Sequence, residues 1–175
     1  MGNIIVNTAG GTAGKGAKSY KLALPSSWIN QLGLSENAKE VELRFDGQSI
    51  TICRRRTLEE TAAYWLAAGH TVLRLRYYDA NLLCSTILAD CTDKTVRAAN
   101  TSAQTVKTAF GRNEFPSWSD FEYILEERCS PKARSGLREY LEAIGVEEYD
   151  PLAIIQKTGG RMAEDDQWIS VEVLK

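Results

Sequence analysis

The sequence lacks the short motifs by which metal and redox sites are usually recognised. Its 175 residues contain one histidine, His70, and four cysteines, and no two cysteines stand in a C-x-x-C pair. This spacing excludes a zinc knuckle and a dithiol redox motif. We expect the thiols to be reduced and mostly buried. No serine, histidine and aspartate set suggests itself from spacing, and we predict neither a cofactor nor a resident metal.

Long hydrophobic runs are also absent. No apolar stretch approaches the roughly 20 residues of a membrane span, and the N-terminus, MGNIIVNTAGG, has no signal-peptide pattern. Hydrophobic residues make up 43% of the chain and charged residues 25%, which is typical of globular proteins. We therefore expect a cytoplasmic protein of one medium domain or two small ones.

The net charge of -2 conceals an uneven distribution along the chain. Residues 1–56 hold eight basic and four acidic side chains, a net charge of +4, whereas residues 57–175 hold 13 basic and 19 acidic ones, a net charge of -6. The first acidic residue is Glu36. Such asymmetry is typical of a basic binding module joined to a part with another role.

Residues 1–56 show the pattern of short strands around one short helix. Apolar residues alternate with polar ones at Ile4 and Val6 and again over residues 19–24, which predicts two strands flanking a glycine-rich stretch. Pro25 suits the start of a helix, with Ser26 and Ser27 able to cap it, and Gly33 suits its end. Alternation returns over 41–45 and 50–52 around an Asp-Gly pair, which predicts a hairpin.

A family resemblance rests on these same residues. The run SYKLALPSSWINQLGLSENAKEVELRFDGQSITICRR resembles the AbrB/MazE/SpoVT swapped-hairpin DNA-binding domain. The matching features are Leu24-Pro25, Leu32-Gly33, Asp46-Gly47, Ile50-x-Ile52 and the basic residues that follow. The resemblance covers about 50 residues, under a third of the chain.

The resemblance implies a homodimer in which two chains interleave their hairpins into one β-barrel and present basic residues to double-stranded DNA. Lys21 matches the basic position before the aliphatic-Pro run, whereas Ile29 and Asn30 occupy places where family members often carry further basic residues. Lysines near exposed glycine amides can approach a phosphate backbone closely. The predicted DNA-binding residues are Lys15, Lys18, Ser19, Lys21 and Asn30.

The glycine-rich stretch also invites comparison with a phosphate-binding NTPase loop. That motif needs G-x-x-x-x-G-K-[ST] followed by a helix. Around Gly14-Lys15, Ala9 replaces the first glycine, Gly16 replaces the serine or threonine, and a strand follows. Three requirements fail, so nucleotide binding is disfavoured here.

Residues 57–175 predict a second, α+β domain. Over 57–112 we expect a helix from Thr57 to Gly69 and strands over 71–79, 81–90 and 94–100. Over 113–175 the period becomes helical, with predicted helices opening at Ser117, Ser130-Pro131 and Asp150-Pro151, which form a helical subdomain. The segment from Glu139 to Ile169 faintly resembles a segment of HipA-type toxin-associated proteins, without any kinase motif.

Other candidate sites in this domain are weaker. Arg74 and Arg76, beside Tyr78 on a polar strand face, are a second candidate contact for nucleic acid or protein. The acidic run 164–166 could hold a divalent metal, but a single carboxylate cluster is more often a solvated loop. His70 follows the C-terminal end of a predicted helix, where a positive charge interacts favourably with the helix dipole. The helices around Cys129 favour a plain hairpin over a helix-turn-helix, because the second one carries Glu139 and Glu142.

The leading hypothesis is a dimeric, non-enzymatic transcriptional regulator that binds double-stranded DNA through residues 1–56. Its most concrete form is an antitoxin-type autorepressor whose acidic domain binds a protein partner such as a toxin. The alternative is an inhibitor protein of a phage or plasmid, of the anti-CRISPR type, that binds both DNA and a nucleic-acid enzyme. A metal-dependent enzyme in the acidic domain is the third and weakest interpretation.

Overall fold

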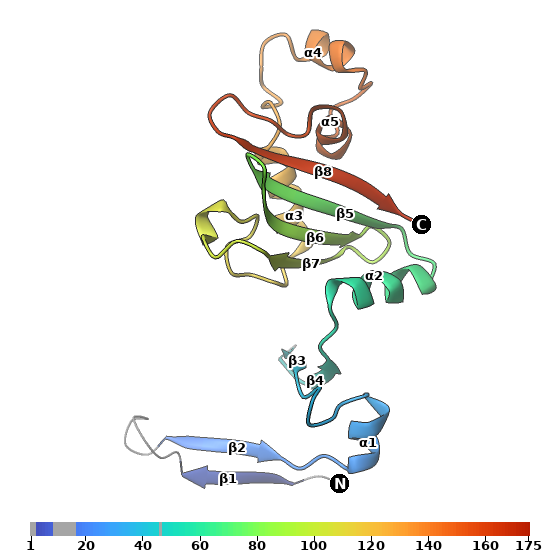
Figure 1. The fold of residues 1–175 in the computed structure, drawn as a ribbon, viewed down its shortest axis with the longest axis vertical. Helices are drawn as coiled ribbons and strands as arrows, with labels where there is room; N and C mark the ends of the chain where they lie inside the picture. Colours follow the sequence, from blue (N-terminus) through green and yellow to red (C-terminus); the bar gives the residue numbers. More distant parts are fainter. Residues whose placement is uncertain (1–2, 9–16, 46) are drawn as a thin grey trace. The chain divides into compact units, whose positions relative to one another are not determined.

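The chain forms two compact units, residues 1–55 and 56–175. The computed structural model describes residues 3–8, 17–45 and 47–175. Its architecture is α+β, and all strand pairs in the described residues are antiparallel (Figure 1). Two separate hairpins belong to the first unit, and one four-stranded sheet belongs to the second.

The first unit contains the predicted strands and short helix. Its elements, in chain order, are β1 (Ile4–Thr8), β2 (Lys18–Leu22), α1 (Ser26–Gln31), β3 (Val41–Phe45) and β4 (Ile50–Arg54). β1 pairs with β2 and β3 with β4, and the described residues form no closed barrel. Pro25 is the N-cap of α1, and neither serine that follows it caps the helix. After the helix, Gly33 adopts a φ of 68°, which suits glycine.

The second unit is built around the four-stranded sheet. Its strands are β5 (Val72–Asp79), β6 (Leu82–Asp90), β7 (Thr95–Asn100) and β8 (Gln167–Leu174), in the order β7-β6-β5-β8. Its helices are α2 (Leu58–Ala67), α3 (Trp118–Glu127), α4 (Leu137–Ile144) and α5 (Pro151–Thr158), with a short 3-10 turn, η1, at Thr105–Lys107.

Two features of residues 113–175 differ from the prediction. The segment is not helical throughout, because β8 pairs with β5 along its whole length and completes the sheet. The helix predicted from Pro131 begins only at Leu137, after Gly136 takes a left-handed φ of 75°. The connection between α3 and α4 is therefore longer than the three- to four-residue turn of a helix-turn-helix. The capping box at Ser117 and Asp120 is confirmed.

The two faces of the sheet are covered unequally. Leu75, Ile87 and Ile169 on one face pack with Phe121 of α3 and Ile154 of α5 into the main core. The other face is covered by α2 at one end, where a smaller buried cluster forms (Figure 1). Its buried members are Ala62, Trp65, Val72 and Leu88. The second unit thus has its own core, and part of one sheet face lies open.

A buried arginine fixes the start of β8. Arg128, 6% exposed, donates two hydrogen bonds to the Asp165 carboxylate, at 2.7 and 2.9 Å, and others to the carbonyls of Gly160 and Gln167. Tyr77 of β5 also donates to the Gln167 side chain. These bonds hold the segment between α5 and β8 against the end of α3.

Gly160→Ala is expected to destabilise the second unit by about 1–3 kcal/mol. Gly160 has a φ of +60°, and a Cβ there would lie 3.1 Å from Arg128 Cβ and 3.3 Å from Ile155 Cγ1. The measurement is the urea midpoint of the variant against wild type. Gly69→Ala is the control, because Gly69 also has positive φ but no atom within 4 Å of the added carbon. Equal losses in the two variants would contradict the steric part of the argument.

The four cysteines form no disulfide, and Cys84 and Cys129 are buried. Burial raises the pKa of the Cys129 thiol to about 11, so this thiol stays protonated at neutral pH.

None of the helices formed by residues 3–8, 17–45 and 47–175 has the length and apolar character to cross a membrane.

Candidate nucleic-acid interface

The β1–β2 hairpin has two chemically different faces. Its register places Ile4 opposite Leu22 and Val6 opposite Tyr20, so these four apolar side chains share one face. Asn7 lies opposite Ser19, and Lys21 opposite Ile5, on the other face. The hairpin is therefore an amphipathic ribbon with a mostly polar face that carries a lysine.

The predicted DNA-binding residues do not all lie on one surface. Ser19 and Lys21 share the polar face of β2, whereas Lys18, at the loop end of the strand, alternates to the other face. Asn30 is exposed on α1. Lys15 lies outside the described residues. Within the described part of the chain, neither Lys18 nor Lys21 forms an ion pair, which leaves both ammonium groups available to an anion.

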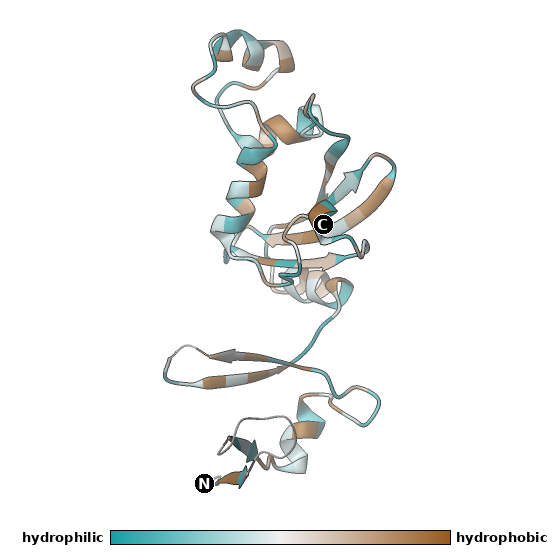
Figure 2. Ribbon diagram, turned by 90° about the vertical axis from the view of Figure 1, so that its left-hand side faces the viewer, coloured by the Kyte–Doolittle hydropathy of each residue, from teal (hydrophilic) through white to brown (hydrophobic). Residues whose placement is uncertain are grey.

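The β3–β4 hairpin repeats this amphipathic design. Cross-strand pairs Leu43 with Ile52 and Phe45 with Ile50 form an apolar face, and hydropathy alternates along its strands (Figure 2). Leu43 is 64% exposed and Phe45 72%. Leu34, at 9%, is the sole buried hydrophobic residue among those described in the first unit. Large exposed hydrophobic residues of this unit are Ile4, Ile5, Val6, Tyr20, Leu22, Trp28, Val41, Leu43, Phe45 and Ile50.

Arg74 and Arg76 point to the sheet face that α3 and α5 leave uncovered. They alternate with the buried Leu73 and Leu75, and both side chains are half-buried. Glu172 of β8 approaches Arg74 at 3.6 Å and Arg76 at 3.1 Å. The sequence indicated the polar face but not this carboxylate, because β8 was not foreseen.

The acidic run 164–166 has a structural role at its centre. Asp165 accepts two of the hydrogen bonds that the Arg128 guanidinium donates, and these two bonds hold the pKa of the Asp165 carboxyl below its usual range. Its Oδ1 also accepts the backbone N–H of Gln167. With its oxygens engaged in this way, Asp165 is a poor metal ligand.

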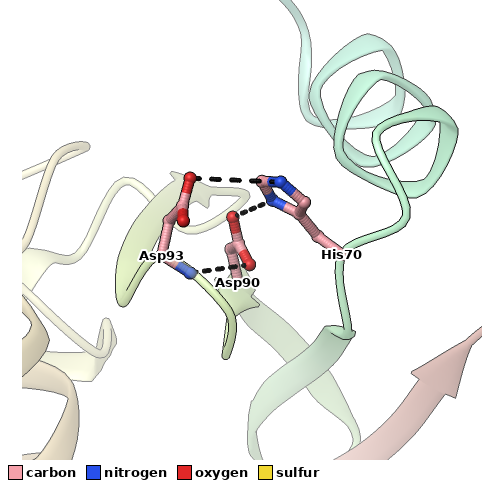
Figure 3. Close-up of side chains that lie close together, drawn as sticks. All are labelled: His70, Asp90 and Asp93. Carbon is pink, nitrogen blue, oxygen red and sulfur yellow. Dashed lines mark hydrogen bonds and ion pairs between the residues drawn. The ribbon is translucent and has the colours of Figure 1, made fainter.

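The sequence did not predict a cluster around His70; it indicated only that this histidine follows the end of a helix. His70 Nδ1 lies 2.6 Å from Oδ2 of the fully buried Asp90, and Nε2 lies 4.0 Å from Asp93 Oδ2 (Figure 3). Asp90 Oδ1 accepts the backbone N–H groups of Thr92 and Asp93. These three residues bring ligand-type atoms within 4.8 Å of one another.

The bonds of this cluster explain its geometry without a ligand. Asp90 ends β6 and caps the turn into β7, while His70 links that turn to the chain between α2 and β5. Both Asp90 oxygens are already accepting hydrogen bonds, so the carboxylate is a turn cap. The sequence did not indicate the His70–Asp90 pair, because the two residues are 20 positions apart.

Comparison of the chain with family models, with curated proteins and with solved structures found no match.

Proposed function

We propose that this chain is a homodimeric regulator that binds double-stranded DNA through its first unit and a protein partner through its second. The observation that carries the proposal is the pair of amphipathic hairpins in the first unit, each with an exposed apolar face, where the described residues include one buried hydrophobic residue, Leu34. An antitoxin-type autorepressor is the most specific form of the proposal, and it includes no enzymatic activity.

A second copy of the chain is the occupant that fits the apolar faces. An isolated two-stranded hairpin is marginally stable in water, and the described part of this unit buries only Leu34 among its hydrophobic residues. Burying one Leu, Ile or Phe side chain contributes about 1.5–3 kcal/mol. Interleaving with a second copy would cover both hairpins at once, as the swapped-hairpin resemblance implies.

The polar face of β1–β2 suits duplex DNA. The major groove of B-DNA admits a two-stranded ribbon, and this face presents Asn7, Ser19 and Lys21. Serine and asparagine can read base edges, while lysine can neutralise phosphate. Lys15 and Lys18, near the glycine-rich loop, would add phosphate contacts.

The net negative charge of the second unit supports a role in binding a protein partner. An apolar groove of about 580 Å³ runs between α3 and the start of α5, and Tyr123 on its rim is 67% exposed. Glu122, Glu126 and Asp150 also line it. A basic segment of a protein partner with an apolar anchor has the chemistry to fill this groove.

The duplex proposal is tested by the salt dependence of binding. With three lysines per chain in a dimer, log affinity should fall with log salt at a slope of about -5, since each phosphate contact adds about -0.9. In the double variant Lys18→Ala/Lys21→Ala, the slope should decrease to about -2. Fluorescence anisotropy on a 20-bp mixed-sequence duplex, from low to moderate salt, measures it.

Lys157→Ala is the matched control, because Lys157 is an exposed lysine on α5 in the second unit. It should leave the slope as in wild type. A wild-type slope near zero would contradict duplex binding altogether. A slope unchanged in the double variant would remove Lys18 and Lys21 from the interface.

A further inference from the structure

One face of the four-stranded sheet concentrates arginines within an otherwise acidic unit. Residues 57–175 carry a net charge of -6, yet Arg74, Arg76 and Arg97 lie on the same sheet face. The register places Arg74 and Arg97 on either side of Leu88, and Arg76 beside Thr86. This set, with Tyr78 and Trp168, is called the arginine face below.

The charge argument concerns Arg74 and Arg76, because Arg97 donates to the Val96 carbonyl and its guanidinium lies 4.7 Å from the Phe115 ring centre. Among the residues of the four strands, the register brings two carboxylates to this face of the sheet, Asp90 and Glu172. Asp90 is fully buried and bonded to His70, so it is not available to the arginines. Glu172 is the carboxylate that approaches Arg74 and Arg76. A side chain shared between two guanidinium groups leaves an excess of positive charge on this part of the face.

The side chains around Arg76, at the centre of the arginine face, are small. Ser170, Thr86 and Ala99 flank Arg76 across β8, β6 and β7 in one row of the register. The helix α2 packs on Val72 and Leu88 at one end, which leaves this row beyond its cluster. The row of small side chains that crosses the sheet therefore holds Arg76, while Arg74 and Arg97 flank the buried Leu88 in the neighbouring row.

Aromatic side chains lie at the other end of the arginine face. Tyr78 and Trp168, paired across β5 and β8, stack with ring centres 4.2 Å apart and planes 8° from parallel. The Arg161 guanidinium lies 4.7 Å from the Trp168 ring centre. Trp168 Nε1 donates to the Ala80 carbonyl at 2.7 Å, which fixes the ring orientation.

We infer that the arginine face binds single-stranded nucleic acid, separately from the duplex contact proposed for the first unit. Arg74 and Arg76 are two residues apart on a strand, so their Cα atoms are about 6.6–6.8 Å apart. Guanidinium forks bind phosphate in two-point geometry. An unpaired strand can lay its phosphates along a sheet face and stack a base on Tyr78, because Trp168 already lies between Tyr78 and Arg161. A duplex cannot stack its bases in this way.

In the free protein Glu172 occupies the place that a phosphate would take between Arg74 and Arg76. A bound strand would exchange this carboxylate for phosphate oxygens on the same two guanidinium groups. Glu172 therefore weakens binding by competition, and its neutralisation should tighten binding. A variant that gains affinity cannot be explained by misfolding.

The test uses the full-length chain and fluorescence anisotropy with mixed-sequence 12-nucleotide DNA and RNA strands. Arg74→Ala/Arg76→Ala should weaken binding by at least about tenfold, and Glu172→Gln should tighten it by about threefold. Arg138→Ala is the control, because Arg138 is an exposed arginine of the same unit that lies on α4. It should bind as wild type does.

Several results would overturn the inference. They are no binding of either strand by wild type, equal affinities of Arg74→Ala/Arg76→Ala and Arg138→Ala, or no gain in Glu172→Gln. A poly-glutamate peptide that binds this face as tightly as the oligonucleotides would point to an acidic protein instead. The Lys18→Ala/Lys21→Ala variant, assayed on duplex, reports on the other proposal, so the two can fail independently.

Discussion

Leu43→Asp is expected to convert the protein into a monomer that no longer binds duplex DNA. Leu43 is 64% exposed in the single chain, and substitutions at such surface positions usually change stability by within about 0.5 kcal/mol. If two copies bury the apolar faces of their hairpins, the aspartate instead places a carboxylate in a desolvated interface opposite Ile52. The effect on assembly is then several kcal/mol.

Thr51→Asp separates this interpretation from a general effect of charge. Thr51 is an exposed residue on the other face of the same hairpin. Size-exclusion chromatography with light scattering should give a dimer for wild type and Thr51→Asp, and a monomer for Leu43→Asp. A dimeric Leu43→Asp would contradict a dimer formed through these hairpins.

Arg128→Ala is expected to lower the free energy of unfolding of the second unit by about 3–5 kcal/mol. The substitution leaves the Asp165 carboxylate and the carbonyls of Gly160 and Gln167 without their donor. Urea denaturation followed by near-ultraviolet circular dichroism measures the loss, because this unit contains Trp65, Trp118 and Trp168.

Arg138→Ala provides the contrast for this prediction. Arg138 also pairs with a carboxylate, at 3.1 Å from Glu142, but its side chain is 89% exposed. Water screens such a pair, and we expect a loss below about 0.5 kcal/mol. Equal losses in the two variants would show that burial of Arg128 does not matter.

Acid should reproduce part of the Arg128 effect. The pKa of Asp165 is lowered in the folded state, mainly by its hydrogen bonds to Arg128. Its contribution is therefore complete above the ordinary aspartate pKa of about 3.9 and is lost as pH falls through the lower folded value. Wild type should lose more stability than Asp165→Asn over this acidic range.

Local patterns in the sequence predicted most of the elements. Alternation predicted the strands of the first unit and β5, β6 and β7, and proline and capping residues predicted α1, α3 and α5. The strand β8 was missed although Ile169, Val171 and Val173 alternate with polar residues. Three apparent helix starts before it suggested a helical end of the chain, and local alternation does not identify a partner strand that lies at least 88 residues away, the separation of Asp79 and Gln167.

The start of α4 was predicted wrongly for a related reason. Ser130-Pro131 is a good local helix start, but residues 131–136 form turns, and the left-handed Gly136 directly precedes the helix. The apolar positions of the helix itself, such as Leu137 and Leu141, were identified. Helix faces follow from periodicity, whereas the exact first residue depends on the packing of the preceding turn.

Local patterns along the chain were enough to predict the two-part charge distribution, the amphipathic hairpins and the alternating polar face of β5. These features are local, because alternation and capping act over a few residues. Three pairings could be learned from the folded chain alone: Glu172 with Arg74 and Arg76, Asp165 with Arg128, and His70 with Asp90. Each of these pairs joins residues distant in sequence, so its geometry exists only once the strands have assembled into the sheet.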